Sequence, residues 1–181
     1  RQMCIRDRVC LWLDDNDLYP NAAEDLARLI SVSPSLRHLH LSHNYLSNHG
    51  AGIVSDACFP QVQVCNFTNN NIGVAGARSL AENLKDPRCN VRTLILDSNH
   101  LGDEGVKEIA EALKRNTSLK CLDLRFNNIT KRGLCLLLDL FRRSENLTLE
   151  TLHLEEDEDE KCVHPHIKRD RRRMHRQQLT V

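Results

Sequence analysis

The chain has 181 residues, of which 40% are apolar, and its 25 lysines and arginines balance its 25 aspartates and glutamates. This length predicts about one domain, and the balanced charge argues against nucleic acid or an anionic membrane surface as a partner. The sequence holds no run of 18 apolar residues, so it also predicts no membrane-spanning helix.

The first eight residues, RQMCIRDR, do not fit the pattern of the rest of the chain. They are predicted to be a non-repeat or artefactual leader, and they are too charged for the apolar segment of a signal peptide. Residues 9–13 are then expected to form an edge strand without a polar cap. We therefore expect a purified sample to be unstable or to self-associate at its N-terminal end.

One pattern recurs along residues 9–155, and its clearest copy begins at Val91. Leu94 and Leu96 are two residues apart, which is the spacing of one face of a β-strand. Asn99 follows, and the apolar residues then take the spacing of a helix face. One strand and one helix cannot bury a core alone, so the copies are expected to stack. The six copies, numbered as repeats 1 to 6, begin at Val9, Leu36, Val62, Val91, Leu119 and Leu149.

Repeats 1 and 3 carry substitutions that still fit the pattern. Pro20 suits the first turn of the helix of repeat 1. In repeat 3, Cys65 and Phe67 take the places of two inward leucines. The buried face of the first helix is predicted to be Ala23, Leu26, Ala27 and Ile30.

The helix of repeat 5, TKRGLCLLLDLFRR, is more apolar than a single buried face requires. Leu136 and Leu140 either add to the core, which is the favoured interpretation, or face outward toward a partner. Repeat 6 has no helix and carries acids at its asparagine and next apolar positions. Such a degenerate repeat is typical of the end of a stack. The core face of the helix of repeat 5 is predicted to be Leu134, Leu137, Leu138 and Phe141.

The phrase L-x-x-L-x-L-x-x-N-x-L, followed by GDEGVKEIAEALKRN, resembles the leucine-rich repeat of the long, helix-bearing, ribonuclease-inhibitor-like class. That class includes the repeat regions of NOD-like receptors and of the Ran GTPase-activating protein. The resemblance implies an α/β solenoid, a partial horseshoe with a parallel sheet on its concave face and helices on its convex face. Three segments follow: a leader over 1–8, the repeat domain over 9–155, and a charged, disordered tail over 156–181.

An asparagine recurs at the bend after each strand of repeats 1 to 5. An amide can donate and accept at once, so a stacked column of amides can satisfy turn backbone groups that would otherwise be buried unpaired. We interpret this column as structural. Its members are Asn16, Asn44, Asn70, Asn99 and Asn127, and glycines that mark the helix starts follow at 50, 73, 102 and 133.

Strand side chains that alternate with the leucines are predicted to form three columns on the concave face. Such a face suits a protein partner and is too open for a small-molecule substrate. The first column is Cys10, His38, Val64, Thr93, Cys121 and Thr151; the middle one is Trp12, His40, Asn66, Ile95, Asp123 and His153; the third is Asp14, Ser42, Thr68, Asp97, Arg125 and Glu155. The candidate partner-binding residues are Trp12, His38, His40, Asn66, Thr93, Ile95, Asp97, Asp123, Arg125 and His153.

Trp12 is the single tryptophan of the chain and stands in the middle column. It is either a binding anchor, since aromatic residues dominate interface energetics, or a residue that lies against a preceding repeat. Ile95 beside Asp123 and Arg125 gives the mixed apolar and charged character of a protein interface.

The sequence predicts no enzyme, metal site or cofactor. His38, His40 and His43, with Cys10 alongside, form one metal-like group, but their spacing matches no zinc motif, so we interpret them as surface residues. The loop that starts at Gly50 partly resembles a dinucleotide-binding fingerprint, but the third glycine is missing and no βαβ fingerprint surrounds it. An open sheet also offers no water-excluded centre for catalysis.

The eight cysteines do not predict disulfides. Cys10 and Cys121 would lie about 19 Å apart, whereas Cys65 and Cys135 fall in apolar positions. Small buried thiols indicate a reducing compartment, so the cytoplasm is expected, with nucleus or cilium as alternatives. The tail alternates acidic and basic runs, which are normally solvated. It could instead fold back on itself or act as a nuclear address.

The leading hypothesis is a non-catalytic intracellular protein-binding module or scaffold that uses the concave face. The resemblance also implies two alternatives, a small-GTPase regulator and the sensing fragment of a NOD-like receptor. A cytoskeletal or ciliary scaffold is a further possibility that no residue selects.

Overall fold

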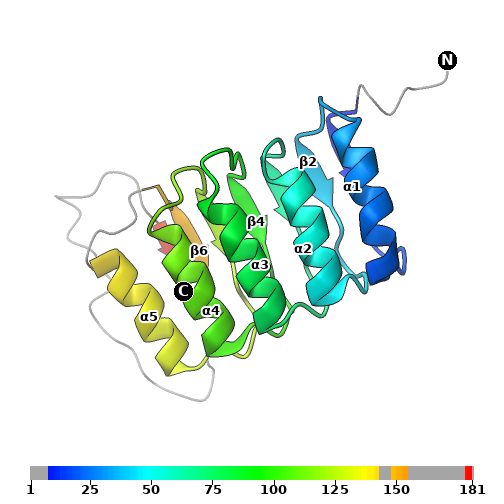
Figure 1. The fold of residues 1–181 in the computed structure, drawn as a ribbon. Coiled ribbons are helices and arrows are strands. Elements are labelled where there is room, and N and C mark those ends of the chain that lie inside the picture. The colour runs from blue at the N-terminus through cyan, green and yellow to red at the C-terminus, as the bar shows by residue number, and fades with distance from the viewer. Residues whose placement is uncertain (1–7, 143–147, 155–177, 181) are drawn as a thin grey trace.

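The computed structural model describes residues 8–142, 148–154 and 178–180. Strands and helices alternate along the chain (Figure 1). The strands are β1 (Cys10–Trp12), β2 (His38–His40), β3 (Val64–Asn66), β4 (Thr93–Ile95), β5 (Cys121–Asp123), β6 (Thr151–His153) and β7 (Gln178–Thr180). A 3-10 turn, Pro20–Ala22, precedes α1 (Ala23–Ser31), and the other helices are α2 (Ser47–Cys58), α3 (Val74–Lys85), α4 (Gly102–Leu113) and α5 (Lys131–Arg142).

The strands form one parallel sheet in chain order, β1 to β7. Each of the first six lies in one predicted repeat, and the arrangement confirms the α/β solenoid. The seventh strand was not predicted. It lies in the charged tail, where the short run Gln178–Thr180 pairs in parallel with β6 and covers the edge that β6 would otherwise present. The rest of the predicted tail and leader lies outside the described residues.

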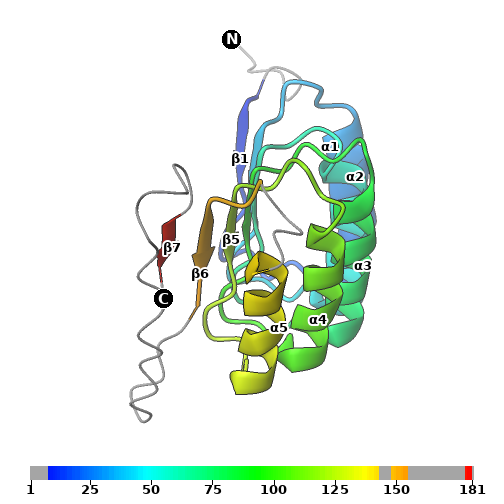
Figure 2. The same cartoon turned by 90° about the vertical axis from the view of Figure 1, so that its left-hand side faces the viewer.

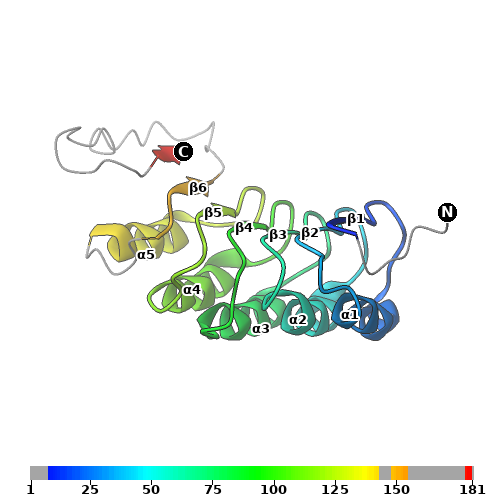
Figure 3. The same cartoon turned by 90° about the horizontal axis from the view of Figure 1, so that it is seen from above.

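Two layers make up the solenoid. Figure 2 shows the strands in one layer and the helices in the other, and Figure 3 shows both rows advancing together from β1 to α5. The core fills the space between the layers, where Leu39, Leu94 and Leu122 are completely buried. Each helix packs against the helices of the neighbouring repeats. In the part of the chain that the structure describes, no helix has the length and apolar character needed to cross a membrane.

From repeat 2 to repeat 5, the asparagine column joins each repeat to the one before it through turn backbone groups. In repeat 4, Nδ2 of Asn99 donates to the carbonyl of Leu96 (2.9 Å) and to that of Phe67 in repeat 3 (2.9 Å). Its Oδ1 accepts from the backbone N–H groups of Asn70 (3.0 Å) and Ile72 (2.9 Å). Nδ2 also lies 3.1 Å from the carbonyl of Asp97, so one amide bonds five backbone groups across two repeats. Asn44, Asn70, Asn99 and Asn127 are buried, whereas Asn16 is exposed.

The glycines near the helix starts separate into two positions. Gly73 precedes α3, and Gly102 opens α4 with a left-handed φ of 56°. A different set lies where consecutive helices approach most closely. A Cβ on Gly76 would come within 2.6 Å of Ile72 Cγ2 and 2.8 Å of Asn48 Oδ1. The close-approach set is Gly50, Gly76, Gly105 and Gly133.

Helix α5 departs from the prediction at Leu138, which was assigned to the core face, and at Cys135. Leu140 is buried, which supports the interpretation that the surplus leucines of this helix belong to the core, whereas Leu136 and Leu138 are half-buried. Cys135, predicted as a small buried residue, is exposed, because it lies on the side of α5 that turns away from the core. Phe141 is outside the residues whose side chains are described.

Candidate protein-binding face

The sheet face is formed by the strand side chains that point away from the helices. The pairing register of strands β1 to β6 places the residues of the first two predicted columns side by side. The third column lies beyond the paired residues, and its last member, Glu155, is outside the described residues. One row of Cα partners runs through Trp12, His40, Asn66, Ile95, Asp123 and His153, and another through Cys10, His38, Val64, Thr93, Cys121 and Thr151.

The first two strands give this face an aromatic end. Trp12 is 65% exposed and its ring stacks on His40, with centroids 3.8 Å apart and planes 9° from parallel. Burial lowers the pKa of His40, an effect that the nearby Asp14 carboxylate opposes. Beside this stack, Cys10 Sγ lies 3.4 Å from Nδ1 of His38. The indole is thus held in place on one side and open to solvent on the other.

The middle of the face is shallow and mixed in polarity. Ile95 is half-buried between Asn66 and Asp123 of the neighbouring strands. Asn66 Oδ1 accepts the backbone N–H of Thr68 at 2.9 Å, so this side chain is fixed by its own turn. Thr93, at the start of β4, and Asp97, two residues beyond its end, are also half-buried.

The fifth strand ends in an ion pair whose carboxylate is buried and whose guanidinium is exposed. Asp123, predicted as a partner-contacting residue, is only 6% exposed. Arg125 covers it with two parallel bonds, Nε to Oδ1 at 3.0 Å and Nη2 to Oδ2 at 2.7 Å, and this carboxylate raises the pKa of the Arg125 guanidinium. Because Asp123 is occupied in this way, Arg125, whose side chain is 47% exposed, presents the pair to solvent. His153 of β6 is half-buried.

Three exposed aromatic residues lie beyond the strands and were not among the predicted contact residues. Tyr19 and Tyr45 stack at 5.2 Å in the loops that follow β1 and β2, and Phe126 lies in the loop that follows β5. The sequence held a signal for them, since aromatic residues occupy loop positions that are polar in most other repeats. We call these strand-to-helix loops the loop edge; they comprise residues 13–19, 41–46, 67–73, 96–101 and 124–130.

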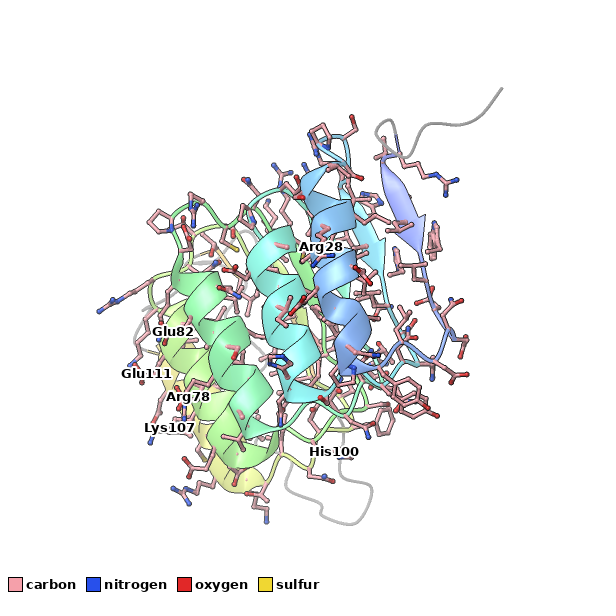
Figure 4. The ribbon with its side chains drawn as sticks, turned by 45° about the vertical axis from the view of Figure 1, so that its right-hand side comes forward. Arg28, Arg78, Glu82, His100, Lys107 and Glu111 are labelled. Atoms are coloured by element: carbon pink, nitrogen blue, oxygen red, sulfur yellow. The ribbon has the colours of Figure 1, made fainter. Side chains whose placement is uncertain are left out.

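The outer face of the helices has a different character. Figure 4 shows Arg78, Glu82, Lys107 and Glu111 on this side of the solenoid. Its charges are paired, as between Arg78 and Glu108 at 3.1 Å across α3 and α4. Within the described residues, histidines, cysteines and acids nowhere form a group of three that could hold a metal ion.

Comparisons with known proteins agree with this architecture. A family model described as "Leucine Rich repeat" matches residues 32–52, 89–110 and 115–137. Protein CARMIL of Dictyostelium discoideum is 34% identical over 64% of this chain and 11% of its own length. The human NACHT, LRR and PYD domains-containing protein 12 is 32% identical over 76% of the chain and 11% of its own length. Pig ribonuclease inhibitor is 25% identical over 71% of the chain and 35% of its own length.

Among solved structures, the leiomodin-1 actin-binding site 2 superposes with a TM-score of 0.52, covering 84% of this chain and 73% of that one at 20% identity. This match supports the fold. The chain spans only 11–14% of the length of the first three relatives. The repeat pattern, the pairing register and the matched family together show that the chain belongs to the leucine-rich repeat proteins of the ribonuclease-inhibitor-like class.

Proposed function

We propose that this chain is a non-catalytic protein-binding module whose partner contacts the sheet face. The observation that carries the proposal is the exposed Trp12 ring, which is held on His40 at the head of an uninterrupted row of strand side chains. A large apolar ring left 65% exposed costs the isolated molecule hydrophobic free energy. A partner that covers it would recover that free energy, and tryptophan is enriched among residues that dominate binding.

The shape of the face favours a macromolecule over a small ligand. Six strands about 4.8 Å apart make a surface roughly 24 Å wide, comparable with one side of a protein interface. Half-buried side chains such as Thr93 and Ile95 give it shallow relief, whereas small-molecule sites enclose most of their ligand. Apolar and polar groups alternate on it, as they do in interfaces that form and separate.

The relatives support binding of proteins in general. Ribonuclease inhibitor is named for its action on an enzyme, and the leiomodin-1 segment is named as an actin-binding site. Those names concern those proteins, and the partner of this chain is proposed only as a protein. The small-GTPase regulator and NOD-like receptor alternatives remain predictions that no single residue favours.

We place this function inside the cell. Six cysteines in the described residues are free thiols, and the buried thiols of Cys58 and Cys65 are hydrogen-bonded, with sulfur atoms 3.8 Å apart, rather than joined as a disulfide. Burial raises the pKa of Cys58 well above its usual value, which suits a thiol that packs as a small apolar group in a reducing environment.

The test is to capture partners of the full chain by crosslinking in its native cells and to compare them with those of a variant that combines Trp12→Ser and Ile95→Ser. The matched control removes surface charge from the helix side, Glu82→Gln with Glu111→Gln (Figure 4). We expect the double sheet-face variant to lose the partners that the control retains. Equal capture by both variants would exclude the sheet face as the binding surface.

A further inference from the structure

One backbone position of the loop edge is left-handed in five consecutive repeats. Its φ angles lie between 50° and 56°. In four of the repeats the N–H of this residue donates to a carbonyl of the next repeat, as from Asn69 to Asp97 at 2.9 Å and from Ser98 to Arg125 at 3.0 Å. Stacking of the repeats therefore holds this conformation at four positions that carry different residues. The five residues are Asp15, His43, Asn69, Ser98 and Phe126.

Phe126 is the exception in this row. Aspartate, asparagine and histidine tolerate left-handed backbone better than other residues with a side chain, whereas a bulky residue there is a strained outlier. The Phe126 side chain is also 54% exposed. It therefore carries two separate costs, backbone strain and apolar exposure, that a polar residue at the same position would avoid. Strain that the fold does not require is typical of functional positions.

The charge of the loop edge indicates what kind of partner would cover it. Asp15 and Asp17 are exposed and take part in none of the ion pairs found among the described residues. The one arginine of this edge, Arg125, is already bonded to Asp123. The edge therefore presents unneutralised negative charge beside its aromatic rings, and that combination attracts cations through both the carboxylates and the ring faces.

The distance between the aromatic groups determines how long a partner segment must be to contact both of them. The Tyr19–Tyr45 stack belongs to repeats 1 and 2 and Phe126 to repeat 5. Three repeats at about 4.8 Å each separate Tyr45 from Phe126 by roughly 14 Å. An extended segment rising about 3.3 Å per residue spans that distance in some four to five residues.

We propose that the loop edge is a second protein-contact surface, distinct from the sheet face, on which Phe126 and the Tyr19–Tyr45 stack anchor an extended partner segment that carries apolar and basic side chains. The sheet face is not needed for this contact. Loss of one surface and loss of the other are therefore separable by experiment.

The first arm of the test measures thermal unfolding of the full chain. Phe126→Asn keeps the left-handed backbone at lower cost and removes the exposed ring, so its unfolding midpoint is expected to rise by about 2–4 °C. The matched reverse variant, Ser98→Phe, places the same ring at the same position of repeat 4 and is expected to lower the midpoint by a similar amount. A fall for Phe126→Asn would show that the ring packs within the chain and would overturn the proposal.

The second arm measures binding to an array of random twelve-residue peptides. We expect the peptides bound by the full chain to be enriched in lysine and arginine next to aliphatic residues, and Phe126→Asn to weaken that binding by about tenfold or more. Trp12→Ser, which alters only the sheet face, is expected to retain it. Absence of bound peptides, enrichment of acidic peptides, or equal binding by Phe126→Asn would each overturn the proposal.

Discussion

Neighbouring positions on the same strands follow different rules in this chain. Leu94 and Leu122 pair in register, and both positions hold a completely buried leucine. The residues that follow them, Ile95 and Asp123, also pair, but they differ in size and in charge. The inward position meets the same environment in every repeat, so packing selects one solution. The outward position meets solvent or a partner, and nothing in the fold requires it to repeat. We call the buried positions that repeat from one strand to the next the frame of the solenoid. The outward positions, which vary from repeat to repeat, form its binding surface.

The largest expected effect comes from breaking the frame. Leu94→Ala leaves a cavity between repeats 3 and 5, and its cost is about 2–5 kcal/mol of unfolding free energy, measured by denaturant titration. Ile95→Ala removes a similar side chain from the half-buried outward position and is expected to cost about 1 kcal/mol or less. Equal losses would contradict the distinction between frame and surface.

The next effect concerns the asparagine column. Asn99→Ala removes the partner of five backbone groups at a buried site and is expected to destabilise the chain by about 2–3 kcal/mol. Asn16→Ala serves as the control, because the side chain of this exposed member of the column donates to the carbonyl of Asp14 within its own repeat. We expect it to change stability by less than about 0.5 kcal/mol. Similar losses for both variants would mean that the column does not act through burial.

A smaller loss is expected where helices approach closely. Gly76→Ala places a methyl group within 2.8 Å of Asn48 Oδ1, which accepts the N–H groups of Gly73 and Gly76. The helix must shift, at a cost of about 1–3 kcal/mol. Ala75→Gly, at the exposed neighbouring position, should lose only the helix propensity of alanine, about 1 kcal/mol. Calorimetry of the two variants ranks them directly.

The smallest effect belongs to the surface and depends on pH. The pKa of His40 lies below its ordinary value of 6.5 in the folded chain, so the unfolded chain takes up a proton more readily. His40 therefore destabilises the fold as pH falls below about 6.5, by less than about 1 kcal/mol because the ring is only partly buried. Trp12 fluorescence should report this protonation with a midpoint under 6.5. Persistence of the transition in His40→Gln would exclude this assignment.

The frame could be predicted from the sequence because a single environment recurs. The period of the leucines, the inward Cys65 and Phe67, and the buried amides of Asn44 to Asn127 all follow from stacking one unit on the next. The surface was harder to predict because it depends on individual partners. Asp123 was predicted to be available, but an arginine two residues later covers it, and sequence spacing does not reveal which rotamer Arg125 adopts.

The loop-edge aromatics and β7 were missed for different reasons. The left-handed conformation at Phe126 recurs at the same position of the four preceding repeats, where hydrogen bonds between repeats hold it, so no local pattern predicts the strain at that position. The pairing of Gln178–Thr180 with β6 joins segments separated by residues of high charge, and a three-residue strand carries little periodic signal.

The most direct test of the central claim uses the emission of Trp12, the single tryptophan of the chain. A partner recovered by crosslinking and lacking tryptophan, or with its own tryptophans replaced, is titrated into the full chain. Burial of the indole against the partner should shift the emission to shorter wavelength along a saturable curve, and Phe126→Asn should leave that shift in place. Saturable binding that leaves the Trp12 emission unchanged would contradict the sheet face as the binding surface.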